Sequence, residues 1–448
     1  MKKVKILSGF MALCFLFTAL SLPAQSNSTW QQLPNAPVAS RHNDLYFINE
    51  ELGWIANGAG QIYRTTDGGG IWEKQFEQSQ THFRCIGFVD SLNGWAGNVG
   101  FGEFGTTDTT VLYHTIDGGT AWQPFNDFEG PKPIGLCGMY VLNDSTIFTV
   151  GRVRGPAFFA RTINRGQTWV SKDLNHLAAG LIDVFFFTPD SGLAVGLTNS
   201  DHTFSSGIVL ATSDGGESWQ ERHVSNRNGE WCWKMSFPSR RVGYVSLQRN
   251  QLAPIWILKT TDGGKSWENQ LFSGTYYFVQ GIGFATEEHG WIGGNSSLPV
   301  FETKDGGETW QAADFGARNN RFRFLREDFG YSVGRTVYKY APQSTVSVAT
   351  PTSPLPVDFA LRQNYPNPFN PTTMITYELT VPHAIELSIY NLLGVRIRTL
   401  VKDGKPAGVH TVHWDAKDKE GKHVSSGIYV YVLKVGKTAA ARRMLLLR

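Results

Sequence analysis

Apolar and polar residues alternate in many short runs along this chain, and one such run recurs at regular intervals. Each run has two apolar residues separated by one position, and a glycine stands six positions after the second of them. Because side chains along a β-strand point alternately to opposite faces, this pattern predicts a half-buried strand, a turn and a second strand. The recurring pairs are Leu45/Phe47, Ile86/Phe88, Val184/Phe186, Met235/Phe237, Ile282/Phe284 and Phe322/Phe324.

A second repeat, Thr-x-Asp-x-Gly-x-x-Trp, follows these strands in six copies that end at Trp72, Trp122, Trp169, Trp219, Trp267 and Trp310. An Asp carboxylate can accept hydrogen bonds from backbone N–H groups of its own turn, and the glycine supplies the positive φ that the turn needs. The repeat therefore predicts a hairpin turn before the last strand of each unit. We expect its acidic or amide residues to be structural and to bind no substrate: Asp67, Asp117, Asn164, Asp214, Asp262 and Asp305.

Four short strands in each unit of this length are typical of a propeller blade. A seventh unit begins at Phe322 and reaches Tyr340 without a copy of the turn repeat. The segment Thr29–Gln32, with Trp30, looks like the end of such a repeat and can supply the missing strand. The sequence therefore predicts an all-β chain whose residues 27–341 form a closed seven-bladed β-propeller, since closure removes the open sheet edges.

Aligning the innermost strands places one position of each blade toward the central channel. It reads Asp44, Cys85, Cys137, Asp183, Lys234, Gly281 and Arg321 around the ring. A charge near the axis is costly unless it is paired, so we predict the ion pairs Asp183–Lys234 and Asp44–Arg321. The loops ahead of these strands predict a ligand-binding mouth, made of Arg41, His42, His82, Glu230, Trp231, Tyr276, Tyr277 and Arg318.

The two ends of the chain have a different composition from the propeller. Lysines precede an apolar run from Ile6 to Leu22, which is the layout of a secretory signal peptide at residues 1–24. A membrane anchor is the weaker interpretation because the run is short and interrupted. Residues 342–356 are rich in Ser, Thr and Pro and uncharged, which predicts a semi-rigid linker. After signal removal we expect no transmembrane segment.

Residues 357–448 read as a small antiparallel β-sandwich of immunoglobulin size, with alternating runs separated by Gly and Pro turns. Several phrases resemble the type A C-terminal sorting domain of the type IX secretion system: Tyr-Pro-Asn-Pro-Phe-Asn-Pro from Tyr365, Ile389 to Gly394, Trp414-Asp415, Ser426 to Tyr429 and Arg443 to Leu446. The resemblance implies export across an outer membrane through the type IX machinery, and release or surface display of the rest of the chain.

The propeller resembles the photosystem II assembly and stability factor type of propeller, through the coupling of Gly-Trp to Tyr-Arg-Thr-Thr-Asp-Gly-Gly between Gly53 and Gly69. The turn repeat resembles the Asp-box, or BNR repeat, which is also found in sialidase-like and sortilin-like propellers. The resemblance implies the fold and does not carry a photosynthetic role to an exported chain.

The charge and the cysteine content of the chain limit which partners and which disulfides can be expected. The chain has 41 basic and 38 acidic side chains, and the excess of basic groups lies outside the propeller, so nucleic acid is not an expected partner. Cys85, Cys137 and Cys232 are odd in number and stand in different blades, which favours buried thiols over disulfides. The sequence predicts no metal site and no cofactor.

Motifs of catalysis give little support for an enzyme. The chain has no His-Glu-x-x-His, Gly-x-Ser-x-Gly or phosphate-loop motif, and we predict no catalytic residue. The first interpretation is a secreted or cell-surface binding propeller whose ligand is a protein or a glycan. The alternatives are an Asp-box glycoside hydrolase, which needs two carboxylates across a cleft, and an assembly factor for an envelope complex.

Overall fold

The computed structural model describes residues 28–295, 298–342, 359–364, 366–391, 395–436 and 438–447. Every regular element in these ranges is a β-strand. The chain divides into two compact units between Ser344 and Thr345. The predicted signal peptide (1–24) and nearly all of the predicted linker (342–356) lie outside the described residues and stay predictions.

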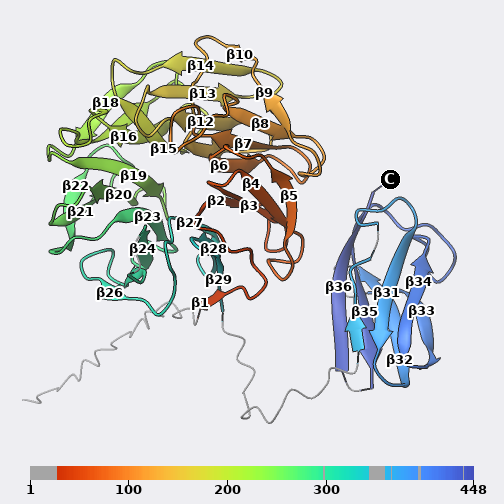
Figure 1. Cartoon of the computed structure of the whole chain (residues 1–448). Coiled ribbons are helices and arrows are strands. Elements are labelled where there is room, and N and C mark those ends of the chain that lie inside the picture. The colour runs from red at the N-terminus through yellow and green to blue at the C-terminus, as the bar shows by residue number, and fades with distance from the viewer. Residues whose placement is uncertain are drawn as a thin grey trace, which may run out of the picture. The chain divides into compact units, whose positions relative to one another are not determined.

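Seven sheets arranged in a ring form the first unit (Figure 1). Each sheet is a blade, numbered here by its order along the chain. Blade one contains β2 (His42–Phe47), β3 (Gly53–Asn57), β4 (Gln61–Thr65) and β5 (Glu73–Glu77); blade two contains β6 (Phe83–Phe88), β7 (Gly94–Asn98), β8 (Leu112–Thr115) and β9 (Gln123–Phe125). Blade three contains β11 (Gly138–Val141), β12 (Ile147–Gly151), β13 (Phe158–Thr162), β14 (Trp169–Asp173) and the short β10 (Phe128–Glu129), which pairs parallel to β14.

The remaining blades have four strands each. Blade four contains β15 (Gly180–Phe186), β16 (Gly192–Leu197), β17 (Gly207–Thr212) and β18 (Gln220–Val224); blade five contains β19 (Glu230–Ser236), β20 (Gly243–Arg249), β21 (Ile255–Thr260) and β22 (Glu268–Ser273). Blade six contains β23 (Val279–Phe284), β24 (Gly290–Gly294), β25 (Phe301–Thr303) and β26 (Gln311–Ala312); blade seven contains β27 (Arg321–Arg326), β28 (Phe329–Val333), β29 (Val337–Pro342) and β1 (Ser28–Gln32).

The last blade is assembled from both ends of the propeller. Strand β1 pairs antiparallel with β29, and Trp30 lies opposite Tyr340 in this register. The order β1-β29-β28-β27 makes β1 the outermost strand of its sheet. The predicted closure by Thr29–Gln32 is therefore confirmed, and the ring has no unpaired gap between its first and last blades.

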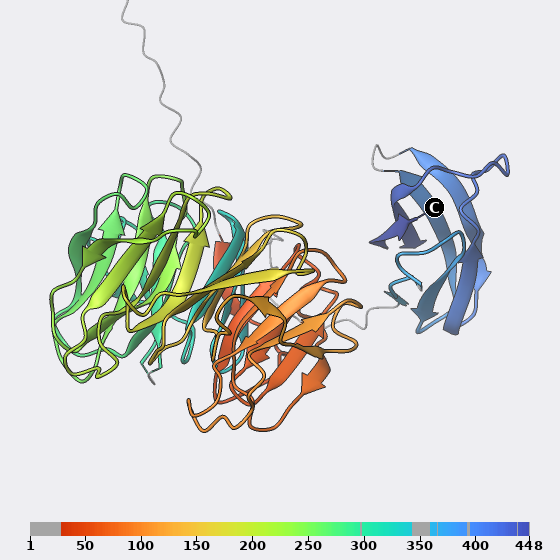
Figure 2. The same ribbon diagram turned by 90° about the horizontal axis from the view of Figure 1, so that it is seen from above.

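Aromatic rings hold neighbouring blades together, and Figure 2 shows the sheets standing face to face around the ring. Phe47 of blade one stacks on Tyr331 of blade seven with centroids 3.7 Å apart, and Trp54 stacks on Phe88 of the next blade at 3.5 Å. The glycine six positions after the aromatic residue makes room for its ring, since a Cβ on Gly53 would lie 2.4 Å from the Phe47 ring. The spacing of aromatic residue and glycine thus encodes the packing between blades.

The six repeat turns share one hydrogen-bond pattern. In the first copy Thr65 Oγ1 donates to Asp67 Oδ1 at 2.9 Å, and the Ile71 backbone N–H donates to the same oxygen at 2.9 Å. In the third copy Asn164 Oδ1 accepts the same two bonds, from Thr162 and from the Thr168 backbone. The side-chain oxygen, which Asp and Asn share, is therefore what the turn uses.

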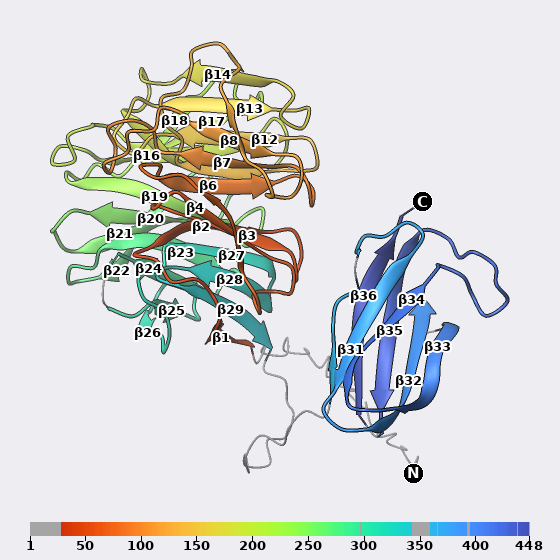
Figure 3. The same cartoon turned by 45° about the vertical axis from the view of Figure 1, so that its right-hand side comes forward.

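The second unit is an Ig-like β-sandwich of two sheets (Figure 3). One sheet contains β30 (Phe359–Leu361), β31 (Thr373–Leu379) and β34 (Gly408–Trp414). The other contains β33 (Arg396–Lys405), β32 (His383–Asn391), β35 (Gly427–Val435) and β36 (Thr438–Leu446). Ile375, Tyr377, Leu387, Trp414 and Tyr431 are fully buried between the sheets, which is the alternation that a sandwich core requires.

Candidate functional site

The innermost strands of the blades surround a central channel with two ends. Strands β2, β15, β19, β23 and β27 lie nearest the middle of the ring in Figure 1. We call the channel end at which the innermost strands begin the N-mouth, and the end at which they finish the C-mouth. The residues predicted for ligand binding precede or begin these strands, so they belong to the N-mouth.

A β-bulge interrupts several innermost strands just before the channel position. In β6 the pairing passes from Phe83–Asn98 to Cys85–Gly97, which leaves Arg84 without a partner residue in the ladder. The same irregularity leaves Asn43 unpaired in β2 and Gln280 unpaired in β23. A bulge redirects the extra side chain, and in this protein it places polar groups in the N-mouth.

Arg84 is the most unusual of these bulge residues. Its side chain is only 1% exposed, and neither Nε nor Nη1 has a hydrogen-bond partner. The guanidinium lies over the rings of Trp233 at 5.1 Å and Phe104 at 5.9 Å. A buried guanidinium with unpaired N–H groups is costly, so Nε and Nη1 are hydrogen-bond donors that a negatively charged group could satisfy.

Further guanidinium groups strengthen the positive potential at the N-mouth. Burial, then the charges of Arg84 and Arg318, lower the pKa of Arg41 to about 9. The guanidinium of Arg154 lies 5.8 Å from the centroid of the Phe104 ring. Its Nη1 is 3.9 Å from the buried carboxylate of Glu103. The N-mouth therefore combines aromatic surfaces with clustered positive charge.

Four of the eight predicted binding residues are buried by the propeller itself. His42 is fully buried with Nε2 2.9 Å from the Pro37 carbonyl, and burial lowers its pKa to about 4. Glu230 is fully buried and ion-paired with Arg227 at 2.8 Å. Trp231 and Tyr277 are 2% and 3% exposed. These four side chains are therefore not exposed to solvent in this structure.

The other four predicted residues reach the surface or its edge. Arg41 donates from Nε to Asn43 at 2.9 Å and from Nη1 to Gln280. His82 stacks on Phe104 with centroids 4.9 Å apart, and burial, Arg84 and Arg41 lower its pKa to about 3. Tyr276 and Arg318 are exposed. Ligand binding by all eight residues stays a prediction.

The middle of the channel contains the predicted ion pairs. Lys234 Nζ lies 3.4 Å from Asp183 Oδ1, and Arg321 Nε lies 2.7 Å from Asp44 Oδ1, so both pairs are confirmed. Arg321 also binds Asp183 across the channel through both terminal nitrogens, each at 3.1 Å. The two expected pairs are thus one network that joins blades one, four, five and seven.

Sequence reasoning missed Arg84, Trp233 and Phe104. Arg84 and Trp233 lie in innermost strands at positions that strict alternation would not direct into the mouth, because the bulges shift the register. Phe104 comes from the loop between β7 and β8 and is 46% exposed. A signal did exist for Arg84, since an arginine inside an otherwise apolar strand is unusual.

Two further features are the free cysteines and the arrangement of side chains that could bind a metal ion. Cys85, Cys137 and Cys232 are buried free thiols, as predicted. Among the described residues no group of three or more His, Cys, Asp or Glu side chains gathers as a metal ion would need. Within the same ranges no helix is long and apolar enough to cross a membrane.

Comparison with known proteins agrees with both parts of this architecture. The family model of the FlgD Ig-like domain matches residues 367–439. The photosystem II assembly lipoprotein Ycf48 of Nostoc sp. (strain PCC 7120 / SAG 25.82 / UTEX 2576) is 24% identical over 225 residues, which cover 50% of this chain and 58% of the relative. The chain therefore spans little more than half of the length of this curated relative.

Solved structures extend the likeness of the propeller. A structure of YCF48 bound to a D1 peptide has a TM-score of 0.52 at 18% identity, and covers 71% of this chain and 98% of its own. An ancestral GH74 enzyme has a TM-score of 0.50 at 12% identity, with 94% of this chain and 64% of its own covered. The first unit is thus similar to Ycf48-like propellers in fold.

Proposed function

We propose that the propeller is a binding protein that holds an acidic segment of a partner protein at the N-mouth. The observation that carries the proposal is the buried Arg84 guanidinium, whose Nε and Nη1 have no partner in the described structure. A carboxylate from a partner would satisfy these donors and offset the neighbouring charges of Arg41 and Arg318. Charge-assisted bonds of this kind gain strength when a partner excludes water.

The loops around the N-mouth favour a protein over a free small anion. They expose large apolar side chains, and exposed apolar side chains together with arginines are typical of protein-binding sites. The exposed residues are Phe101 (62%), Phe104 (46%), Phe204 (62%), Leu252 (46%) and Tyr276 (39%). The similar propeller YCF48 has been solved with a D1 peptide, which supports a peptide ligand here. A glycan is the alternative ligand.

The glycoside hydrolase alternative finds less support in the channel. The two carboxylates in the middle of the channel are those of Asp44 and Asp183, and both are bound to Arg321. Burial raises the pKa of Asp183, but the charges of Arg321 and Lys234 outweigh it and hold that pKa near 2. A carboxylate held ionised in this way does not suit the proton-donating role that glycoside hydrolysis requires.

We further propose that the chain is exported and that residues 357–448 direct it to the type IX secretion machinery. The match to an FlgD Ig-like domain supports a compact β-sandwich at this place, and the signal-like residues 1–24 support export. The test is expression in a bacterium that has the type IX system. The full chain should reach the cell surface or the medium, whereas a chain without residues 357–448 should accumulate in the periplasm.

The binding proposal is tested by selecting linear peptides on the purified full chain from a random displayed library. We expect acidic peptides to be enriched, and their affinity to fall at least about tenfold in Arg84→Gln and to weaken with salt. Arg326→Gln is the matched control, because Arg326 is exposed and ion-paired with Glu50 and Asp328 at the far ends of the strands. Selection of neutral peptides, or binding that Arg84→Gln leaves unchanged, would contradict the proposal; a glycan array then tests the alternative.

A further inference from the structure

The channel opens at the C-mouth into a cavity of about 240 Å³, which contains none of the residues of the N-mouth. It is lined by residues within or directly after the innermost strands of blades three to seven, and Arg321 and Asp183 of the central ion-pair network are among them. Ligand pockets for drug-sized molecules start at about 300 Å³, so this cavity fits a single ring or side chain. Nothing in the binding proposal above uses it.

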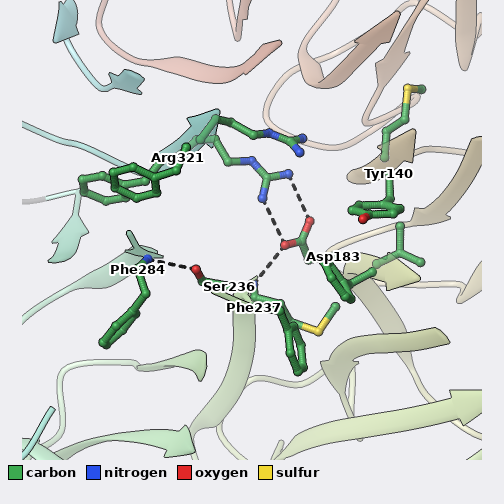
Figure 4. Close-up of a pocket in the computed structure, with 13 residues that line it drawn as sticks. Tyr140, Asp183, Ser236, Phe237, Phe284 and Arg321 are labelled. Atoms are coloured by element: carbon green, nitrogen blue, oxygen red, sulfur yellow. Dashed lines mark hydrogen bonds and ion pairs between the residues drawn. The ribbon is translucent and has the colours of Figure 1, made fainter. Parts of the chain in front are cut away.

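One wall of this cavity is aromatic. Tyr140, Phe185 and Phe237 come from blades three, four and five, and each is only half-buried. The centroids of Tyr140 and Phe185 are 4.7 Å apart, and those of Phe185 and Phe237 are 4.7 Å apart with nearly parallel planes. Figure 4 shows Tyr140, Phe237 and Phe284 around the Arg321–Asp183 pair. These partly exposed rings give the cavity an aromatic lining that an apolar ring can pack against.

Asp183, Arg321 and Arg323 line the cavity, and together with Asp44 and Lys234, which are paired with them, their charges do not balance. Asp44 and Asp183 together meet three cations: Arg321 and Lys234, which they bind directly, and Arg323. Arg323 is the least compensated of the three, because its Nη2 is 3.8 Å from Asp44 and its buried Nε has no partner. The cavity therefore has one positive charge in excess.

The groups around Arg323 do not cancel that charge. The centroid of the Tyr46 ring lies 5.9 Å from the Arg323 guanidinium carbon, in a cation–π contact. Asp44 already accepts hydrogen bonds from Arg321 and from the Ile86 backbone N–H. Burial, then the neighbouring charge of Arg321, lowers the pKa of Lys234 to about 8 in spite of its two carboxylate neighbours. A single negative charge on the ligand would restore the balance.

We propose that the C-mouth cavity binds a carboxylate joined to an aromatic ring by a short chain, with Arg323 holding the carboxylate and the Tyr140–Phe185–Phe237 wall holding the ring. Such a group can belong to a free arylalkanoate or to the C-terminal aromatic residue of a polypeptide. The two sources share the chemistry that the cavity recognises. This site differs in place from the acidic-segment site of the N-mouth, so either proposal can fail alone.

The test is calorimetric titration of the full chain with 3-phenylpropionate and, separately, with the neutral 3-phenylpropanamide. We expect the acid to bind at least about tenfold more tightly than the amide, which is a difference of about 1.4 kcal/mol. Equal affinities, or no binding of the acid up to about 10 mM, would overturn the proposal. This comparison uses the unmodified protein, so it does not depend on the folding of any variant.

Variants then assign the two halves of the site. Arg323→Gln should remove the preference for the acid, and Phe185→Leu should weaken acid and amide alike. Arg335→Gln, an exposed arginine in the turn between β28 and β29, is the matched control and should change neither affinity. A preference for the acid that survives Arg323→Gln would overturn the role of Arg323. The dipeptide Gly-Phe distinguishes the two sources of the carboxylate. If Gly-Phe binds more tightly than 3-phenylpropionate and its amidated form does not bind, the ligand is the C-terminus of a polypeptide. If 3-phenylpropionate binds more tightly than Gly-Phe, the ligand is the free acid.

Discussion

The Arg321 guanidinium crosses the propeller channel to Asp183, with Nη1 and Nη2 each 3.1 Å from one carboxylate oxygen. The two residues are 138 positions apart in the sequence and belong to blades seven and four. Since the remaining nitrogen, Nε, binds Asp44 of blade one, one side chain connects three blades through charge-assisted hydrogen bonds. This network therefore spans the channel, and Arg321 and Asp183 also line the C-mouth cavity.

Replacing Arg321 should destabilise the propeller strongly. Arg321→Met leaves Asp44 and Asp183 buried without their main cation, and we expect a loss of about 3–5 kcal/mol in the free energy of unfolding. Urea unfolding followed by tryptophan fluorescence measures this in the propeller, where all but one of the 14 tryptophans lie. Arg326→Gln breaks exposed ion pairs and one cation–π contact with Phe329, and should cost about 1 kcal/mol or less. Similar losses in both variants would refute a special role for the network.

Lys234 should make the stability depend on pH in the alkaline range. Burial lowers its pKa from 10.5 to about 8 in the folded protein. Between these two values the folded state releases the proton that the unfolded state still binds, so stability from this group should rise with pH across that window. We expect the difference in unfolding free energy between wild type and Lys234→Met to grow in favour of wild type from pH 8 to pH 9.5. A constant difference would show that Lys234 stays charged in the folded protein.

The propeller can be predicted well from the sequence because each repeat contains the residues that determine a local strand or turn. Alternation gives each strand, the Thr-x-Asp-x-Gly-x-x-Trp phrase gives each turn, and Trp30 gives the closing strand. The alignment of repeats also identifies Asp44, Asp183 and Lys234 as channel residues. These inferences succeed because each depends on register within one blade or on the order of the blades.

The features that were missed depend on distances across the channel or on broken alternation. An alignment shows that Arg321 faces the channel but not that it reaches Asp183 on the opposite side. The bulge at Arg84 moves this side chain away from the face that strict alternation assigns to it. Phe185 was likewise passed over in favour of Phe186, although Phe185 lines the C-mouth cavity and Phe186 is buried between blades.

Trp30 should be a strong determinant of ring closure. Its ring stacks on Phe315 at 4.9 Å and meets Trp291 edge-on at 5.5 Å, so it joins β1 to the adjoining blade. Trp30→Ala should reduce the free energy of unfolding by about 3 kcal/mol or more. Gln31→Ala, the next residue and exposed, should change it by less than about 0.5 kcal/mol. Thermal unfolding of the two variants measures the difference, and equal midpoints would mean that β1 contributes little to closure.

The repeat turns should contribute to stability and not to binding. Asp214 Oδ1 accepts hydrogen bonds from Thr212 Oγ1 at 2.8 Å and from the Ser218 backbone N–H at 2.9 Å. Asp214→Ala removes this acceptor and should cost about 1–2 kcal/mol. Asp214→Asn should retain most of the stability, because Asn164 makes the equivalent bonds in blade three.

Chemical denaturation of these variants tests the structural role, with Glu221→Ala as the control. Glu221 is exposed in β18 of the same blade, and its removal should change the stability by less than about 0.5 kcal/mol. The affinities of Asp214→Ala for an N-mouth peptide and for a C-mouth acid should equal those of the wild type, because the turn hydrogen bonds stay within residues 212–218. Loss of binding with unchanged stability would instead place a ligand at the turn, and the six copies would then have to be examined as binding sites.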